Sequence, residues 1–269
     1  MAHQKQEEGK GRRTDEGEAY SFGYTSVSAQ EKTRLVHEHF DSIAGKYDWM
    51  NSLLSLGLHH AWKRKAVAAA GLAPGHLVLD GCGGTADLSL LACNTLGEEG
   101  RAIVYDMNRT MMQVGQRKAL RSPSAGRVVF VEGDVECMPF PDGTFDAVMV
   151  AFGIRNLTHV EDGLREIHRV LKEQGTFVCL EFSKEITWWF KPLYDVYSFA
   201  FMPLAGRVLA GSRKAYTYLP ESIRVFATPG ELSNVLEGIG FTDVSFTKLT
   251  QGIAVVHRAT KGSAGRPRT

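Results

Sequence analysis

The sequence has few cysteines, and none of them lies close to another. Four cysteines are scattered over 269 residues, and no CxxC pair is present. The disulfide framework of a small secreted domain is therefore excluded, and we expect reduced thiols in a cytoplasmic compartment. Isolated cysteines of this kind more often fill apolar space than bind a metal.

The sequence also lacks a long hydrophobic run and an excess of either charge. No stretch reaches the ~18 apolar residues of a membrane span, and the charged start lacks the apolar core of a secretory signal. Lys plus Arg number 31 against 30 for Asp plus Glu, so the formal charge is only +1. No strong field favours nucleic acid as a partner.

The polar ends bound a single expected domain. Residues 1–21 and 259–269 are poor in apolar side chains, and we expect them to be disordered tails. The remaining 22–258 has enough apolar residues to bury one large core.

The sequence does contain a regular alternation of strands and helices. Nearly continuous β-rich apolar runs, typical of strands that are covered on both faces, occur at 77–80, 102–106, 128–134, 145–152 and 176–182. Helical patterns fall between them, at 87–96, 109–120 and 160–173. This order predicts an α/β fold with a doubly wound, mostly parallel, Rossmann-like sheet. A last helix at 228–241 and a hairpin of 244–250 with 252–259 should follow.

A glycine-rich loop follows the first predicted strand, in the stretch VLDGCGGTAD. Gly83 and Gly84 lack a Cβ atom, so backbone N–H groups there can approach a ligand. In an open α/β sheet, ligands bind beyond the carboxyl ends of the strands, beside the first strand. A plain tight turn is the alternative interpretation of this loop alone.

Acidic residues end three successive predicted strands. Asp80 ends the first, Asp106 the second, where a carboxylate can bind two ribose hydroxyls, and Asp134 the third. This set suits a nucleoside with a charged amino-acid tail, and S-adenosylmethionine is the obvious candidate. A dinucleotide stays open as the alternative, because Ala86 stands where the last glycine of GxGxxG would be, and that fingerprint tolerates alanine.

Several longer motifs resemble one family in particular. FGYTSVSAQEKTRLVHEHFDSIAGKYDWMNSLLSLGLHHAWKR, LDGCGGTAD, MPFPDGTFD, FGIRN, LEFSK and YLPESIR stand in the order expected of the ubiquinone/menaquinone biosynthesis C-methyltransferases. The resemblance runs from about Phe22 to Arg258. It implies a class I methyltransferase fold whose last hairpin adds an antiparallel strand. It also implies S-adenosylmethionine-dependent methylation of a ring carbon on a polyprenylated quinol, in menaquinone or ubiquinone biosynthesis, with demethylmenaquinol to menaquinol favoured. A methyltransferase acting on a lipid amine or a small phenol is the alternative.

The resemblance also implies which residues contact the cofactor. Family contacts fall on Thr85, Asp106, Asp134 and Val135, and a fourth, usually a serine before FG, falls on Ala151. With the loop, the expected cofactor site is Asp80, Gly83, Gly84, Thr85, Asp106, Asp134, Val135 and Ala151.

The expected catalytic residues stabilise a phenolate. A quinol that loses a phenolic proton becomes electron-rich at its ring carbon, and FGIRN places Arg155 and Asn156 just past the fourth strand. We expect Arg155 to stabilise the oxyanion and Tyr47 to orient the ring or a water. A salt bridge between Arg155 and Glu181 and a packing role for Tyr47 are the alternatives. No general base is assigned.

The remaining expectations concern metals and partners. Adjacent His59 and His60 would point about 100° apart on a helix, so we expect no metal site. Residues 22–70 should form an N-terminal helical cap, and the aromatic-rich stretch 184–227 a helical lid. Cap and lid would form an apolar mouth for the prenyl chain, with peripheral contact to the inner face of the membrane. Ordinary packing of the lid on the sheet and a homodimer both stay open.

Overall fold

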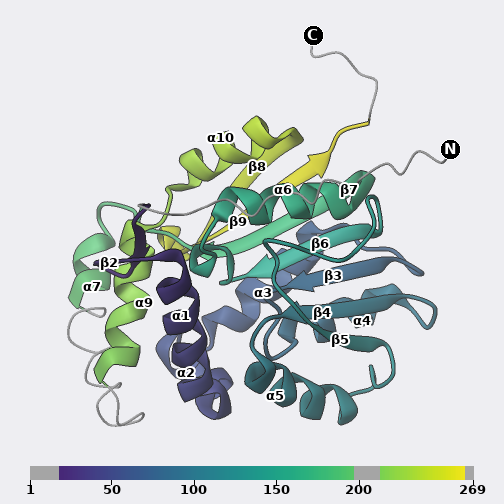
Figure 1. Cartoon of the computed structure of the whole chain (residues 1–269), viewed down its shortest axis with the longest axis horizontal. Coiled ribbons are helices and arrows are strands. Elements are labelled where there is room, and N and C mark those ends of the chain that lie inside the picture. The colour runs from purple at the N-terminus through teal and green to yellow at the C-terminus, as the bar shows by residue number, and fades with distance from the viewer. Residues whose placement is uncertain (1–17, 197–212, 264–269) are drawn as a thin grey trace, which may run out of the picture.

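The computed structural model describes residues 18–196 and 213–263 (Figure 1). Most of the expected tails and the middle of the expected lid lie outside these residues. Regular structure extends past both ends of the expected domain: β1 (Tyr20–Phe22) pairs with β2 (Thr25–Val27), and β9 (Ala254–Lys261) continues beyond residue 258.

A single sheet of seven strands forms the centre of the described chain, in the order β5-β4-β3-β6-β7-β9-β8. The strands from β5 to β7 in this order are parallel, and β9 is antiparallel to both β7 and β8. The predicted fold class is thereby confirmed. Besides β9, the strands of this sheet are β3 (Leu77–Gly81), β4 (Arg101–Asp106), β5 (Val128–Glu132), β6 (Phe145–Ala151), β7 (Leu171–Phe182) and β8 (Phe241–Leu249).

The central strands read as continuous apolar runs because both faces of the sheet are covered. Val78 and Leu79 in β3 are both fully buried although they point to opposite faces. Helices α3 and α4 contribute to the core on one face, and α6 and α10 to the core on the other. The helices around the sheet are α3 (Leu58–Ala69), α4 (Asp87–Leu96), α5 (Arg109–Leu120), α6 (Val160–Val170) and α10 (Pro229–Ile239).

Local sequence explains where several helices begin and end. Thr228 and Glu231 form a reciprocal capping box at the start of α10, and Gly240 ends that helix with a φ of 117°. At the start of α5, the Asn108 side chain accepts a hydrogen bond from the Met111 amide. The start of α5 is thus fixed beside the end of β4.

A helical cap lies over one end of the sheet. It comprises β1, β2, α1 (Ala29–Ile43), the 3-10 turn Ala44–Lys46 and α2 (Tyr47–Leu54), with α7 (Lys191–Val196) and α9 (Arg213–Val225) at the same end in Figure 1. Lys32 anchors α1, since its Nζ is buried and donates a 2.6 Å hydrogen bond to the carbonyl of Leu157. Asn108 donates to Asp41 at 3.1 Å. The cap therefore packs on the carboxyl ends of β4 and β6.

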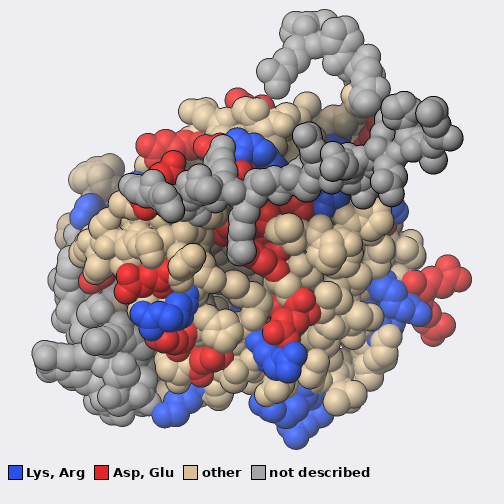
Figure 2. Space-filling model, viewed as in Figure 1, with Lys and Arg blue, Asp and Glu red and all other residues tan. Residues whose placement is uncertain are grey.

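The surface carries mixed charges. On the face shown in Figure 2, Lys and Arg are interspersed with Asp and Glu, in keeping with the formal charge of +1. Within 18–196 and 213–263, no helix is long and apolar enough to cross a membrane.

Candidate active site

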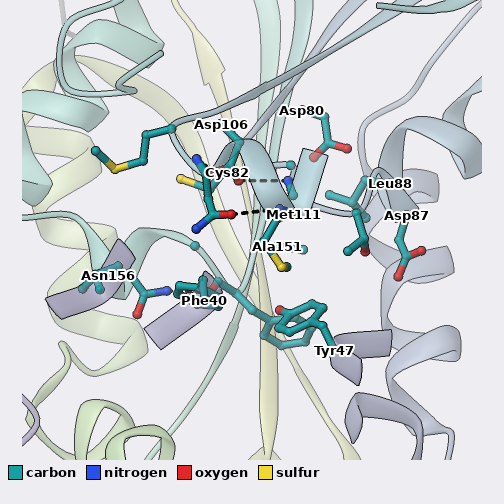
Figure 3. A pocket seen from close by; sticks show the side chains of 18 of the residues that line it. Phe40, Tyr47, Asp80, Cys82, Asp87, Leu88, Asp106, Met111, Ala151 and Asn156 are labelled. Carbon is teal, nitrogen blue, oxygen red and sulfur yellow. Dashed lines mark hydrogen bonds between the residues drawn. The ribbon is translucent and has the colours of Figure 1, made fainter. Parts of the chain in front are cut away.

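A cavity opens at the carboxyl ends of β3, β4 and β6, beneath the cap. It encloses about 800 Å³, part of it open to solvent. In Figure 3, Asp80, Cys82 and Asp106 lie on one side of it, with Phe40 and Tyr47 facing them from the cap. This is the edge where the sequence predicts a ligand, and we call this space the cofactor cavity.

The loop after β3 has an unusual backbone. Cys82 has a φ of 52°, Gly84 of 45° and Ala86 of 67°, all in the left-handed region. A Cβ atom on Gly83 would lie 2.6 Å from the carbonyl oxygen of Asp80. A Cβ on Gly84 would lie 3.3 Å from Met111 Cε and 3.7 Å from the Asp106 carboxylate. The close packing at Gly83 and the left-handed backbone at Gly84 therefore both favour glycine.

Asp106 lines the cavity, and backbone amides hold its carboxylate in place. One carboxylate oxygen accepts a hydrogen bond of 2.9 Å from the Gly84 amide, and the other one of 2.7 Å from the Asn108 amide. Each oxygen retains a second lone pair. Burial raises the pKa of Asp106 to about 6, although the two amide hydrogen bonds oppose this shift. Asp106 is therefore mostly ionised at neutral pH and can accept from two ribose hydroxyls.

Asp80 is held in place by hydrogen bonds from the first turn of α4. It is 2% exposed and accepts hydrogen bonds from the amide and the hydroxyl of Ser89, at 2.9 and 2.8 Å. Burial raises its pKa to about 7, against the effect of these hydrogen bonds. Asp80 thus fixes α4 to the end of β3, and it also lines the cavity.

A charged network joins the loop to the cap. Thr85 donates to Asp48 of α2 at 2.8 Å, and Lys118 of α5 donates to the other oxygen of Asp48 at 2.7 Å. Lys118 also contacts Asp87, which accepts from Lys63 at 2.5 Å. Although burial opposes ionisation, Lys63 and Lys118 lower the pKa of Asp87 to about 2. The network ties α2, α3, α4 and α5 together beside the cavity.

Of the other expected cofactor contacts, one lines the cavity and two do not. Ala151 ends β6 and lines the cavity. Asp134 is exposed and accepts from the Glu136 amide at 2.9 Å, and Val135 is 3% exposed and packs in the core. Neither Asp134 nor Val135 belongs to the lining of the cofactor cavity.

Arg155 lies in a buried ion pair. Its Nη1 donates to both carboxylate oxygens of Glu181, at 2.9 and 3.0 Å, and to the Phe152 carbonyl at 2.7 Å. The side chains of Arg155 and Glu181 are 5% and 2% exposed. Burial would lower the pKa of Arg155, but Glu181, Tyr218 and Tyr47 raise it, so the guanidinium stays charged. The salt bridge considered above is present, and Arg155 is a fixed charge behind the cavity wall.

Tyr47 and Asn156 both line the cofactor cavity. Tyr47 begins α2 and packs edge-on against Phe40, with ring centroids 6.0 Å apart. Asn156 accepts a 2.8 Å hydrogen bond from the Tyr218 hydroxyl and donates to the Phe152 carbonyl at 3.2 Å. Asn156 is therefore oriented by α9, which lies within the expected lid, although the sequence did not predict this contact.

A second, apolar cavity adjoins the first. It encloses about 1050 Å³, part of it open to solvent, and Trp62, Phe152, Phe182 and Leu54 are among the residues that line it. Phe152, with a φ of 59°, lines both cavities and stacks on Phe182 at 4.4 Å between centroids. Phe152 stands in the FGIRN motif, but its strained backbone and its position between two cavities have no signal in the sequence.

The fold and this site define the class of protein. A solved SAM-dependent methyltransferase from Aquifex aeolicus shares the fold, with a TM-score of 0.54 and 18% identity; the match covers 74% of this chain and 89% of that one. A SAM-dependent methyltransferase from Thermotoga maritima also shares it, with a TM-score of 0.58 and 17% identity; the match covers 84% of this chain and 99% of that one. The sheet and its flanking helices are those of a Rossmann-like methyltransferase fold.

The chain belongs to the ubiE/COQ5 methyltransferase family, which matches residues 26–261. It is 45% identical to the ubiquinone/menaquinone biosynthesis C-methyltransferase UbiE of Azotobacter vinelandii, over 89% of this chain and 95% of the relative. It is 43% identical to the UbiE protein of Pseudomonas syringae pv. tomato, over 89% and 94%. The resemblance stated from the motifs is confirmed, and the chain is an S-adenosylmethionine-dependent C-methyltransferase.

Proposed function

We propose that this protein methylates a ring carbon of a polyprenylated quinol in quinone biosynthesis, with demethylmenaquinol to menaquinol as the preferred conversion. The observation that carries the proposal is the apolar cavity beside the cofactor cavity, with Phe152 in the wall of both. A cofactor in the first cavity and a prenylated ring in the second would meet at this residue. The volume of the apolar cavity leaves room for a fused naphthol ring.

The residues of the first cavity suit S-adenosylmethionine. Asp106 would accept from the ribose hydroxyls, and the backbone of Gly83, Gly84 and Thr85 would approach the amino-acid tail. Asp80 and Ala151 complete this wall, and Asp134 with Val135 are proposed beside the adenine. When bound, the cofactor supplies a methyl group already activated by a sulfonium.

The protein must make the ring carbon electron-rich and hold it in line. Arg155 provides a positive charge that stabilises a phenolate, since its buried pairing with Glu181 holds the guanidinium in one place. Tyr47 orients the ring from the cap, and Asn156 binds a ring oxygen while Tyr218 holds its amide in place. Arg155, Tyr47 and Asn156 thus position the ring and stabilise its oxyanion. None of the three is suited to take the phenolic proton.

The protein is also proposed to contact the inner face of the membrane, where its prenylated substrate resides. Leu56 and Leu58 line the apolar cavity and are 72% and 40% exposed. Trp188 and Trp189, just before the cavity residue Phe190, are 84% and 56% exposed. Exposed aromatic and aliphatic side chains of this kind suit an interfacial contact. Flotation with anionic liposomes tests this, and absence of binding even with quinone lipid present would overturn it.

The decisive test is methyl transfer from labelled S-adenosylmethionine to two reduced acceptors: demethylmenaquinone and the demethylated methoxy-benzoquinol, each with a short prenyl chain. Products are identified by mass. We expect methylation of the naphthoquinol ring to be the faster of the two. Tight cofactor binding with neither quinol methylated would overturn the proposal in favour of a lipid amine or a small phenol as acceptor.

A further inference from the structure

The N-terminal hairpin of β1 and β2 packs on α9. The ring of Phe22, the last residue of β1, stacks on the ring of Tyr218 in α9, with centroids 4.3 Å apart and an angle of 20° between the planes. The amide of Tyr24 donates a 3.2 Å hydrogen bond to the carboxylate of Glu221, also in α9. Both contacts join elements that lie at the same end of the molecule in Figure 1. Hairpin and helix are thus held together by a ring stack and by a backbone hydrogen bond.

Gly23 permits this close approach. It begins the turn between the two strands with a φ of 59°, in the left-handed region that favours glycine. A Cβ atom on Gly23 would lie 3.0 Å from the Cβ of Glu221, and closer still to its carboxylate. A hairpin of two strands with three residues each has little stability by itself, so its place on the protein depends on contacts of this kind.

The start of the hairpin is anchored just before α6. The Tyr20 hydroxyl lies 3.0 Å from Nε2 of His159, and the two rings meet edge-on with centroids 5.1 Å apart. Nδ1 of His159 lies 2.7 Å from the Glu136 carboxylate. His159 is the N-cap of α6, in the segment that follows Asn156. The hairpin therefore connects α9 to the same segment of the chain that carries the FGIRN motif.

The buried face of α9 contacts both polar side chains of FGIRN. The Tyr218 hydroxyl donates to Oδ1 of Asn156 at 2.8 Å, and Nε of Arg155 donates to the Ser222 hydroxyl at 3.4 Å. Tyr218 and Ser222 are four residues apart, so they lie on one face of the helix, and each is 4% exposed. A displacement of α9 would therefore move the partners of Arg155 and Asn156 together.

Two hydrogen bonds fix the orientation of the Asn156 amide. A carbonyl oxygen can only accept, so the atom that faces the Phe152 carbonyl at 3.2 Å must be Nδ2, and Oδ1 must face Tyr218. Burial raises the pKa of Tyr218 to about 12, with Arg155 opposing and Glu181 adding to the shift, so the hydroxyl keeps its proton at neutral pH. One N–H and one lone pair of this half-buried amide remain for a ligand in the cofactor cavity, which Asn156 lines.

From these contacts we infer that the N-terminal hairpin is a positioning element of the active site: Phe22 holds Tyr218, and Tyr218 keeps the Asn156 amide turned towards the phenolic oxygen of the acceptor. The inference rests on the proposed function, in which Asn156 binds a ring oxygen, and adds to it residues that act from outside the cavities. Neither Phe22 nor Tyr218 lines the cofactor cavity or the apolar cavity. Both are therefore positioning residues, and both act through Asn156.

The first test compares Phe22→Ala with Tyr24→Ala. Tyr24 is the matched control, because its side chain is 63% exposed and its contact to Glu221 uses only the backbone amide. Turnover is measured anaerobically with short-chain reduced demethylmenaquinone. The affinity and stoichiometry of S-adenosylhomocysteine binding are measured by calorimetry, so that the folded fraction of each variant is known.

We expect Phe22→Ala to lose about tenfold or more in kcat, because a displacement of about 1 Å at a positioning group can cost about 100-fold. Its affinity and stoichiometry for S-adenosylhomocysteine should stay unchanged, since the hairpin contacts none of the residues expected to bind the cofactor. Tyr24→Ala should match the unaltered protein in both measurements.

A double-mutant cycle tests whether Tyr218 acts through Asn156. Tyr218→Phe removes only the hydroxyl and keeps the ring that stacks on Phe22, so it tests the inference even if Phe22→Ala does not fold. We expect it to lose about tenfold in kcat, and Asn156→Ala to lose at least as much. The double variant should lose no more than Asn156→Ala alone, because both changes remove the same function. Independent structural effects would instead multiply.

A second readout does not depend on turnover. 1-Naphthol is a soluble phenol, and its affinity is measured by calorimetry with S-adenosylhomocysteine present in excess. Loss of one hydrogen bond to its oxygen corresponds to about a fivefold lower affinity. We expect this loss in Tyr218→Phe and in Asn156→Ala, and no further loss when the two are combined.

The outcomes separate the inference from the proposed function. If the unaltered protein methylates neither quinol, the proposed function fails, and the naphthol cycle alone decides the inference. If it methylates a quinol while folded Phe22→Ala or Tyr218→Phe retains kcat within about twofold, the proposed function stands and the inference is overturned. Losses that multiply in the cycle, or equal losses in Phe22→Ala and Tyr24→Ala, would also overturn it.

Discussion

The hydroxyl of Thr85 donates a 2.8 Å hydrogen bond to the carboxylate of Asp48, and so joins the glycine loop to the first turn of α2. Thr85 is 3% exposed, and Asp48 has Lys118 as its second partner. The loop that should bind the cofactor and the cap that should cover the substrate are therefore mechanically connected.

Replacement of Thr85 by valine tests this connection. Valine has nearly the same shape but no hydroxyl, so the hydrogen bond to a charged group is lost. We expect the free energy of unfolding to fall by about 1.5 kcal/mol, the low end for such bonds because Asp48 is partly exposed, and S-adenosylhomocysteine to bind more weakly. Urea unfolding and calorimetry measure both, and Thr85→Ser should restore them. A Thr85→Val protein as stable as the unaltered one would refute a structural role for the contact.

Asp106→Ala should abolish cofactor binding. The carboxylate is proposed to accept from two ribose hydroxyls, and two charge-assisted bonds correspond to a loss of about 100-fold or more in affinity. Glu132→Ala is the matched control, since Glu132 is the exposed partner of Asp106 in the β4–β5 register. Calorimetry measures the affinity of both variants for S-adenosylhomocysteine. Retained affinity in Asp106→Ala would show that the ribose lies elsewhere.

Arg155→Ala should destabilise the protein as well as reduce turnover. Removing one partner leaves Glu181 buried and uncompensated, which costs about 3–5 kcal/mol. The double variant Arg155→Met, Glu181→Leu removes both charges, and we expect it to regain most of the free energy of unfolding. It should remain inactive if Arg155 stabilises the phenolate. Full activity in the stable double variant would assign Arg155 a structural role only.

The pH dependence of stability should reveal Asp87. Burial opposes its ionisation, but Lys63 and Lys118 lower its folded pKa to about 2 from an unfolded value of 3.8. Its contribution is therefore present above about pH 4 and is lost as the pH falls towards 2, with a magnitude of about 2 kcal/mol. Unfolding of the unaltered protein and of Asp87→Asn should differ at pH 6, and the difference should shrink by pH 3. A constant difference would contradict the ion-pair assignment.

Sequence alone determined the sheet and its helices, and it predicted the edge of the sheet at which a ligand should bind. Continuous apolar strands, the glycine loop and Asp106 are local signals in the sequence. Burial of a strand on both faces requires consecutive apolar residues, and a tight loop after a strand requires small residues directly after it. The motifs around Tyr47 and Arg155 identified the family for the same reason. The ends of the domain were less well defined, since β1 has only three residues and the end of β9 pairs with strands that come earlier in the chain, β7 and β8.

Only the tertiary structure decided how the side chains of the site are used. The pairing of Arg155 with Glu181, the orientation of Asn156 by Tyr218 and the position of Phe152 between two cavities depend on elements far apart in sequence. His59 is the clearest case. The sequence offers two adjacent histidines, whereas only the packing of α2 against α3 buries His59 and places its Nε2 3.1 Å from the Ser52 hydroxyl.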